Sequence, residues 1–423
     1  MSSSTMAQAQ AGAAQAEASG TRFLYICDFP PSEEDGGRIL LKRLLQAHPP
    51  ENICVFTTSA ALRRSSAGER LPCRHVGFPI FYRSRWRLLT RIRHAISWLI
   101  IAGISMVAAL EIWRRKADVI LTILHGRLYF AAAAAGALTC TPYIMFVHDD
   151  RVSQTQGATC FWRRVGKPLT GLVLRHAAHV YCISPGMQRF LRAEFNVQSE
   201  VQWPATRVGR CMPAPRLHEP GVLTILFAGA IHYANQDSLG LLVDLLRSGT
   251  LRSAGLPHVK LHIYTRLGEC PPSIVSGGGP DVFIGDWLRQ VQLPRVLQEA
   301  DILFLPYSFL AGSRHAVETA FPSKVADYVA AGKPILVFAP AYSTLARYAA
   351  QEQFTELVTQ FDQEALAGAI RKLALSSAYR EMLARRALEV LQRNHDISRQ
   401  RQQFCRLLLR SKLPHCDLPE GIL

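Results

Sequence analysis

Short apolar runs alternate with helix-length segments along most of this chain. In its first half, five such runs occupy residues 23–29, 53–58, 117–123, 143–149 and 179–184. The runs are rich in Val, Ile and Leu and continuously apolar, which is typical of parallel strands covered by helices on both faces. We therefore predict a doubly wound α/β domain over the first half.

The same alternation restarts after a stretch that contains Pro, Arg and Gly, residues 204–221, which predicts a linker. The later runs lie at residues 224–230, 259–265, 281–286, 300–307 and 334–340. The chain is thus predicted to be α/β, with two tandem Rossmann-like domains and a ligand cleft between them. We assign residues 1–21 to a disordered tail, 22–206 to an N-terminal domain and 207–221 to a linker. Residues 222–378 form the predicted C-terminal domain, and 379–423 the C-terminal helices with a tail.

The composition indicates in which cellular compartment the protein works and what charge its partner carries. The chain has 423 residues, of which 49% are hydrophobic and 19% charged, and this excludes a disordered chain or a coiled coil. Ten cysteines are scattered without a CxxC, so we expect reduced core thiols in a cytosolic protein and no metal site. The net charge is +16, of which residues 1–212 carry +13, so the first half is expected to meet an anionic partner.

The basic residues concentrate around one apolar helix. Residues 83–116 contain eight Lys or Arg and a single acidic residue, and they bracket the uncharged segment from Ala95 to Leu110. Sixteen residues are fewer than the roughly 20 that span a bilayer. Two interpretations stay open: a buried helix with solvated arginines, or a helix that contacts an anionic membrane surface with the help of Trp86, Trp98 and Trp113.

Polar residues follow several predicted strands, at the edge of the sheet where ligands bind. Gly36 and Gly37 precede a helix after the first strand, and can form an anion-binding turn or a plain tight turn. His148 ends the fourth strand together with Asp149 and Asp150, and it can bind a sugar or phosphate oxygen, act as an acid or base, or support a neighbouring residue. His125 has the same position one strand earlier, although Gly126 alone can explain that turn.

The segment from Glu318 to Pro340 is the most informative for chemistry. Ser323 begins a predicted helix and Lys324 lies in its first turn, so a free helix N-terminus and a lysine meet where a strand passes into a helix. This arrangement suits a diphosphate. Asp327 lies three residues later on nearly the same face, where its carboxylate can accept hydrogen bonds from ribose hydroxyls.

Residues 321–337, FPSKVADYVAAGKPILV, resemble the donor-binding signature of retaining family 4-type glycosyltransferases with the glycosyltransferase-B fold. FLYICDFPPSEEDGGR resembles the N-terminal glycine loop of that family, FVHDD its cleft histidine and FAGAIHYANQDSLGLLVDLL the opening of its donor domain. The resemblance covers roughly residues 22–395. It implies that Gly37 approaches the donor phosphates, that His148 contacts the transferred sugar and that Asp327 holds the ribose.

The sequence departs from the family pattern at two places. The family commonly has two glutamates separated by seven residues, whereas eight residues separate Glu318 from Asp327 here, so the sugar-contacting role of Glu318 is open. Many relatives also place Arg and Lys after the first strand of the donor domain, where this chain has Gly-Ala-Ile-His. Cations that could replace them are Lys324, Arg266 and Arg314.

The resemblance implies transfer of a sugar from a nucleotide-diphosphate sugar to a hydroxyl of a glycan or lipid-linked acceptor, with retention and without a metal or cofactor. We expect a hexosyltransferase of polysaccharide biosynthesis that is cytoplasmic and peripheral at the inner face of the cell membrane. Two alternatives are a nucleotide-sugar epimerase of similar fold and a non-catalytic protein that binds nucleotide sugars. Nucleic-acid binding is disfavoured because no aromatic platform accompanies the positive charge.

Overall fold

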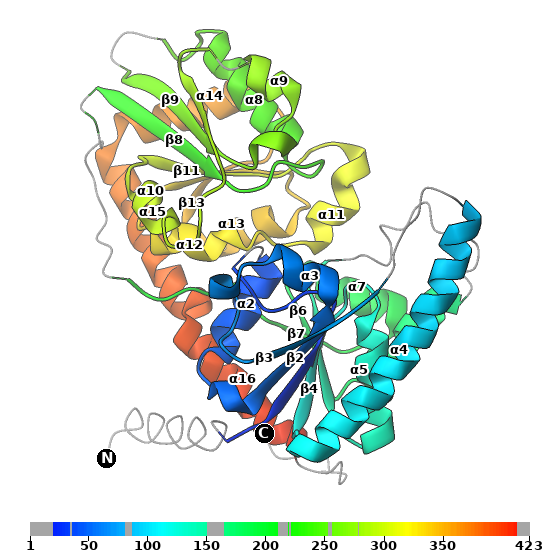
Figure 1. Cartoon of the computed structure of the whole chain (residues 1–423). Coiled ribbons are helices and arrows are strands. Elements are labelled where there is room, and N and C mark those ends of the chain that lie inside the picture. The colour runs from blue at the N-terminus through cyan, green and yellow to red at the C-terminus, as the bar shows by residue number, and fades with distance from the viewer. Residues whose placement is uncertain are drawn as a thin grey trace, which may run out of the picture. The chain divides into compact units, whose positions relative to one another are not determined.

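A computed structural model defines the fold (Figure 1). It describes residues 20–33, 36–80, 87–149, 165–209, 219, 221–252, 256–277 and 279–412, without the side chains of residues 87–95, 277 and 409–412. The chain forms two compact units, the first from Met1–Ile183, Met187–Gln202 and Ser398–Leu423, and the second from Ser184–Gly186 and Trp203–Ile397. The tail predicted at residues 1–21 and the linker predicted at residues 207–221 fall mostly outside the described residues.

The first unit contains a seven-stranded parallel sheet with the order β3-β2-β1-β4-β5-β6-β7. Its strands are β1 (Phe23–Ile26), β2 (Ile53–Thr58), β3 (Arg74–Phe78), β4 (Val119–Ile123), β5 (Tyr143–Val147), β6 (His179–Cys182) and β7 (Glu200–Val201). In the central register Phe23 lies between Ile53 and Val119. The five apolar runs of the first half form the five inner strands, and the two edge strands are additional.

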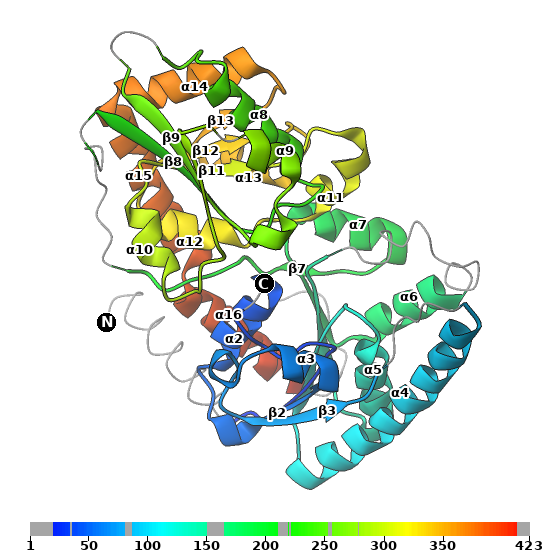
Figure 2. The ribbon, with the colours of Figure 1, turned by 45° about the horizontal axis from the view of Figure 1, so that its top comes forward.

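The helices of this unit cover both faces of the sheet (Figure 2). They are α2 (Gly36–Leu45), α3 (Ser59–Arg64), α4 (Arg87–Arg115), α5 (Leu128–Thr139), α6 (Lys167–His176), α7 (Pro185–Phe195) and α16 (Ile397–Lys412). Buried side chains of α4 to α7 pack on one face. On the other face, the ring of Phe404 in α16 lies 6.4 Å from that of Phe23 and 6.3 Å from that of Phe146. The C-terminal helix thus completes the first domain.

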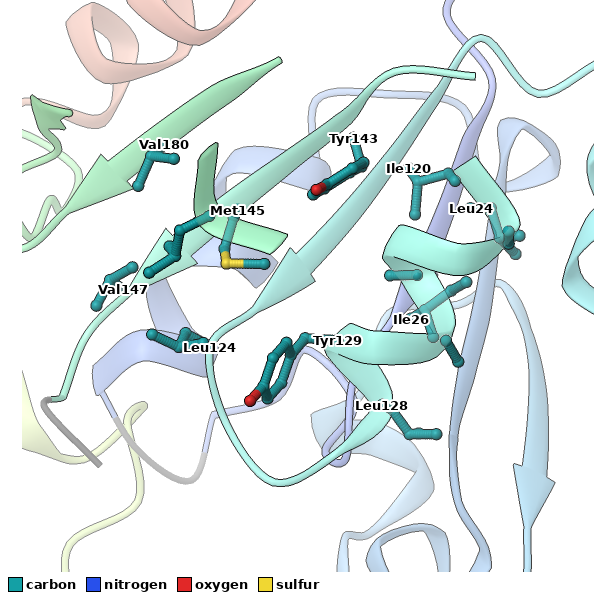
Figure 3. Packing of buried hydrophobic residues seen from close by; sticks show 14 of the residues in the cluster. Leu24, Ile26, Ile120, Leu124, Leu128, Tyr129, Tyr143, Met145, Val147 and Val180 are labelled. Carbon is teal, nitrogen blue, oxygen red and sulfur yellow. The ribbon is translucent and has the colours of Figure 1, made fainter. Parts of the chain in front are cut away.

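The core on the α4 to α7 side comes from alternate strand residues (Figure 3). Leu24, Ile120 and Met145 point into it from neighbouring strands, and Leu128 and Tyr129 of α5 meet them. Because strand side chains alternate between faces, continuously apolar strands supply a core on each side of the sheet.

The second unit contains a six-stranded parallel sheet with the order β10-β9-β8-β11-β12-β13. Its strands are β8 (Val222–Ala228), β9 (His258–Tyr264), β10 (Val282–Gly285), β11 (Ile302–Pro306), β12 (Ile335–Phe338) and β13 (Thr355–Val358). Its helices are α8 (Gln236–Arg247), α9 (Pro272–Gly277), α10 (Leu293–Gln298), α11 (Arg314–Thr319), α12 (Lys324–Ala330), α13 (Thr344–Glu352), α14 (Gln363–Leu375) and α15 (Ser377–Val390). Two Rossmann-like domains are confirmed.

One expectation about the cysteines is wrong. Cys140 is exposed rather than part of the core, because it ends α5 in a left-handed conformation with a φ of 53°. Among the described cysteines, Cys73 and Cys270 are only half-buried, and Cys27, Cys54, Cys182 and Cys405 are buried.

Candidate functional site

In the first unit, the glycine turn and the predicted histidine are in contact. Gly37 lies in the first turn of α2, and His148 directly follows β5. A Cβ atom added to Gly37 would lie 2.6 Å from Cδ2 of His148 and 3.1 Å from its Nε2. No side chain fits between the helix backbone and the half-buried imidazole, so Gly37 lets the start of α2 approach His148 closely. Gly36 is the first residue of the same helix.

The neighbouring strand ends are organised by Asp28, which sequence reasoning missed. This buried residue follows β1, and its carboxylate accepts a 2.6 Å hydrogen bond from the amide of Arg127 at the start of α5. Gly126 has a φ of 64°, and a Cβ there would collide with the Asp28 carboxylate. The glycine therefore serves the turn, while the ring of His125 packs 4.8 Å from that of Phe29. Asp150, next to the exposed Asp149, lies outside the described residues.

In the second unit, Lys324 reaches the carboxyl end of the first strand. Its Nζ lies 3.9 Å from the ring centroid of Phe227, the penultimate residue of β8. Gly229 directly follows that strand with a φ of 145°, and a Cβ there would lie 2.4 Å from Nζ. Lys324 thus brings a positive charge to the place where the sequence shows Gly-Ala-Ile-His in place of the cations of many relatives.

The surroundings of Lys324 make its ammonium group easy to deprotonate. The residue as a whole is partly exposed, but protein atoms surround the ammonium, and this desolvation lowers the pKa to about 7. No ion pair or hydrogen bond to Nζ is present among the described residues. The helix is held in place by Tyr328, whose buried hydroxyl accepts a 2.9 Å hydrogen bond from the amide of Ala228. An anionic ligand bound here would stabilise the charged form of Lys324.

The other predicted donor-binding residues lie in and just before α12 and in the segment after β9. The Asp327 carboxylate accepts a 3.4 Å hydrogen bond from the side-chain amide of Gln290, in the segment after β10. Arg266 follows β9, and its guanidinium carbon lies 4.6 Å from the ring centroid of Trp287. Ser323 immediately precedes α12 but makes no capping hydrogen bond with its side chain. Sequence reasoning missed Gln290 and Trp287, whose positions after β10 were the available signal.

Glu318 lies in a segment whose backbone is tightly enclosed. Its carboxylate pairs with Arg314, one turn earlier in α11, at 3.1 Å. The Arg314 guanidinium also lies over the ring of Tyr342 at 4.7 Å. A Cβ on Gly186 would lie 1.8 Å from the carbonyl oxygen of Glu318. Of the three cations proposed to replace the missing pair, Arg314 and Arg266 are therefore engaged with other side chains, and Lys324 is the one against Gly229.

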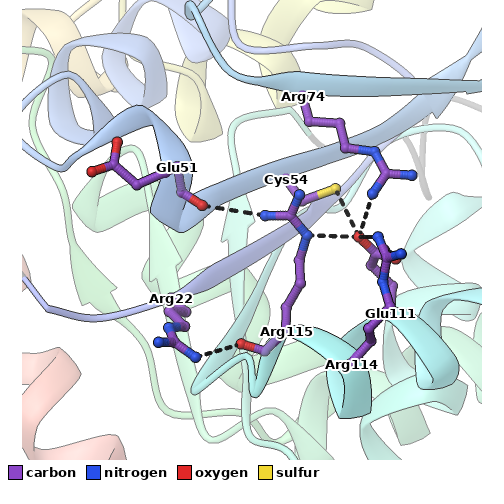
Figure 4. Close-up of polar contacts among 7 residues, drawn as sticks. All are labelled: Arg22, Glu51, Cys54, Arg74, Glu111, Arg114 and Arg115. Carbon is purple, nitrogen blue, oxygen red and sulfur yellow. Dashed lines mark hydrogen bonds and ion pairs between the residues drawn. The ribbon is translucent and has the colours of Figure 1, made fainter.

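The basic bracket around α4 is partly used inside the protein (Figure 4). The Glu111 carboxylate lies 2.6 Å from Nε of Arg115, 2.9 Å from Nη1 of Arg74 and 3.2 Å from Nη2 of Arg114. Burial raises the pKa of Glu111, but hydrogen bonds from Arg115 and Arg114 outweigh this and lower it. The C-terminal end of α4 is thus fixed to the sheet. Of the other bracketing residues, 83–86 and the side chains of 87–95 lie outside the described part.

Two family models match the chain, one to each unit. The model described as "Glycosyl transferase 4-like domain" matches residues 45–204, and that of "Glycosyl transferases group 1" matches residues 222–376. Together they cover most of the chain. Among curated proteins the comparison finds no match.

Solved structures share the fold over nearly the whole chain. Anabaena HepE in complex with UDP-glucose has a TM-score of 0.66 at 14% identity, over 92% of this chain and 99% of that one. Sucrose-phosphate synthase from Thermosynechococcus elongatus has a TM-score of 0.61 at 16% identity, over 92% of this chain and 100% of that one. A glycosyltransferase from Rickettsia africae has a TM-score of 0.61 at 11% identity, over 93% and 99%. Since two glycosyltransferase domain models match in order along two Rossmann-like units, the chain belongs to the family 4-type glycosyltransferases of the glycosyltransferase-B fold.

Proposed function

We propose that this protein transfers a sugar from a nucleoside-diphosphate sugar to a hydroxyl group of a glycan or lipid-linked acceptor, with retention at the anomeric carbon. The observation that carries the proposal is the Lys324 ammonium against Gly229, at the carboxyl end of the first strand of the second unit. Ligands bind at this edge of open parallel sheets. Solved relatives of the same fold are described with UDP and UDP-glucose bound.

The second unit offers partners for each part of such a donor. Lys324 would neutralise the diphosphate, together with the amides that open α12 near Ser323. The Asp327 carboxylate would accept hydrogen bonds from the ribose hydroxyls, and Gln290 orients that carboxylate. Arg266, stacked on Trp287, would contact the nucleotide from the neighbouring strand ends. We infer no role for a metal or another cofactor in this scheme.

The reaction breaks the bond between the sugar anomeric carbon and the diphosphate oxygen, and forms a bond from that carbon to the acceptor oxygen. The acceptor hydroxyl gives its proton to the departing phosphate oxygen, from which it passes to solvent, and the nucleoside diphosphate leaves with the electron pair of the broken bond. A cation and oriented amides that bind this charge more strongly as it develops lower the barrier. His148, held against Gly37, would contact the transferred sugar, and Glu318 stays a second candidate for that contact.

For the acceptor, we infer a membrane-associated glycan or lipid-linked sugar, and a protein that is peripheral at the inner face of the cell membrane through the region around residues 83–116. The support is the exposed apolar side chains of α4 between Ile96 and Trp113, together with the excess positive charge of the first half. An acceptor with an anionic head and a lipid tail would match both features.

The donor assignment is tested by ligand binding. Thermal unfolding with a panel of UDP, GDP, ADP and their sugars should show stabilisation by one nucleotide class. Lys324→Met and Asp327→Asn should each weaken that binding, whereas Arg295→Met, a control at an exposed residue of α10, should not. If no nucleotide of the panel raises the unfolding temperature, the proposed function is wrong.

Incubation with the donor alone separates the two alternatives from transfer. An epimerase would release an epimerised nucleotide sugar without an acceptor, and the family match does not favour this outcome. A binding protein without catalytic activity would bind the donor, but no sugar transfer in cells would depend on it. Transfer should be lost in a His148→Ala and Asp327→Ala double variant. Of the two single variants, Asp327→Ala alone should weaken binding of UDP, which lacks the sugar that His148 would contact.

A further inference from the structure

The outward face of α4 is an apolar stripe that no described part of the first unit covers. Its members follow one another at spacings of three and four residues, so they line one side of the helix. Leu99, Leu110 and Trp113 are 75%, 65% and 80% exposed. From Ile96 to Trp113 the stripe is about 26 Å long. The exposed residues of the stripe are Ile96, Leu99, Ala102, Gly103, Met106, Val107, Leu110 and Trp113.

The two neighbouring helices continue this apolar surface. α5 contacts both α4 and α6, and the three helices lie near one another in Figure 2. Its outward residues include Leu138, which is exposed beside two exposed alanines. On α6, Leu169 and Leu172 are exposed one turn apart, and Val165 lies one turn before them. Large exposed apolar patches on soluble proteins mark interaction sites.

The charged residues on and around these three helices indicate which kind of partner would cover the apolar surface. α4, α5 and α6 contain one acidic residue, Glu111, and it points inward into the arginine cluster of Figure 4. Basic residues lie along the rim: Arg114 is exposed at one end while it pairs with Glu111, and Arg175 on α6 is exposed while it donates to the carbonyl of Phe195. Lys167 at the start of α6 pairs with Glu194 of α7. An apolar face with a basic rim and no outward carboxylate complements an anionic lipid surface better than it complements a second protein.

The residues on the inner face of α4 indicate whether this helix would lie on a membrane or cross it. By length and composition, the segment Ile96–Arg115 could span a bilayer. However, Ile104, Ala108 and Ile112 are buried in the core, and the buried Ser105 hydroxyl donates to a carbonyl of its own helix. A spanning helix would have to leave that core and carry Glu111 into the hydrocarbon, which is costly.

We propose that the outer faces of α4, α5 and α6 form one docking surface that lies flat on an anionic lipid leaflet. It deepens the proposed function, because a flat contact would hold the first unit at the surface that carries a lipid-linked acceptor. The apolar stripe would enter the headgroup boundary, and the basic rim would contact the lipid phosphates. Trp113 lies at the end of the stripe, where an indole at the interface is favourable.

The test is co-flotation of the full-length protein with vesicles of phosphatidylglycerol and phosphatidylcholine, compared with phosphatidylcholine alone. The wild type should bind the anionic vesicles, and about 0.5 M NaCl should weaken binding. The pairs Leu99→Glu with Leu110→Glu on α4, and Leu169→Glu with Leu172→Glu on α6, should each reduce binding about tenfold or more. The control pair Val291→Glu with Leu375→Glu replaces exposed apolar residues of the second unit and should leave binding unchanged.

Three results would overturn the proposal. An α6 pair that binds like the wild type would show that the surface does not extend beyond α4. A wild-type dimer that the α4 pair converts to a monomer, measured by light scattering, would make a second copy the occupant. Retention in membranes after alkaline carbonate extraction would show a spanning helix. UDP binding measured on the same samples separates this test from the proposed function, because each can fail while the other holds.

Discussion

Replacing Lys324 with arginine or methionine tests the chemistry of the donor site most directly. In the ligand-free protein, desolvation lowers the pKa of this lysine to about 7. A bound diphosphate would stabilise the charged form and raise the pKa again, because an opposite charge favours ionisation. Binding should therefore draw a proton from solution whenever the pH lies above the pKa of the free site.

The magnitude follows from the fraction of lysine that is charged before binding. With a pKa of about 7, half of the ammonium groups are charged at that pH, but only about 3% are at pH 8.5. UDP affinity should therefore fall about 15-fold between those two pH values, which corresponds to about 1.6 kcal/mol. At about pH 8, close to 0.9 proton should be taken up for each nucleotide bound.

The assay is isothermal titration calorimetry with UDP in buffers that have different ionisation enthalpies. The dependence of the binding enthalpy on the buffer reports the number of protons taken up. Lys324→Arg keeps a charge at every pH of the assay, so its affinity should be flat with pH and its proton uptake near zero. The arginine variant also retains His232 in the loop after β8 and Asp327 on α12, so subtracting its profile removes their contributions.

Protein stability gives a second readout with the opposite sign. The lysine holds fewer protons in the folded state than in the unfolded state between about pH 7 and its ordinary value, so ligand-free stability should rise with pH across that window. Lys324→Met should remove this rise while it weakens UDP binding. Wild-type UDP affinity that does not change between about pH 7 and 8.5 would show that Lys324 does not lose its charge in this range in the ligand-free site, even if the nucleotide binds.

Three further predictions concern the glycines and the acid that shape the two units. Gly37→Ala should displace the histidine after β5 and lower the transfer rate about tenfold or more with little change in unfolding temperature, whereas Gly68→Ala, where a Cβ meets nothing within 4 Å, should leave kinetics unchanged. Gly186→Ala should lower the unfolding temperature by several degrees in thermal scans, because its Cβ would collide with the carbonyl of Glu318. Glu111→Gln should reduce the free energy of unfolding in urea by about 1–2 kcal/mol at neutral pH, since the carboxylate is nearly buried but two of the arginines that it binds are largely exposed. That difference should shrink as the solution is acidified, because the lowered pKa of Glu111 makes its contribution disappear at low pH.

The sequence predicted the inner strands and the edge strand β10 (Val282–Gly285), but it missed the other three edge strands, for a physical reason. Inner parallel strands are buried on both faces, so they appear as uninterrupted apolar runs. The edge strands Arg74–Phe78 and Thr355–Val358 carry exposed or half-buried polar residues, and Glu200–Val201 has only two residues. Such segments have no distinct pattern of their own, because their pairing with a neighbouring strand defines them.

The candidate site was predictable where a motif is local and not where distant segments meet. Lys324 and Asp327 stand in one turn of helix, and their spacing predicted a shared role. The contact of Lys324 with Gly229 joins residues far apart in sequence, and nothing in either segment indicates it. For the same reason, the sequence left three cations as alternatives. Only the structure distinguishes them, because Lys324 lies beside the strand end whereas Arg266 and Arg314 contact other side chains.

The position of the Glu111 carboxylate in the structure changes how we interpret the positive charge of the first half. In the sequence, Glu111 is a lone acid that dilutes a basic bracket. In the structure, it pairs with Arg74 and Arg115, which fix α4 to the sheet, and with Arg114, whose side chain stays 62% exposed at the rim. Removing the acid from the outer surface leaves that surface apolar with a basic rim. A single ion-pair cluster thus anchors the helix and, by the same geometry, clears its outer face of negative charge.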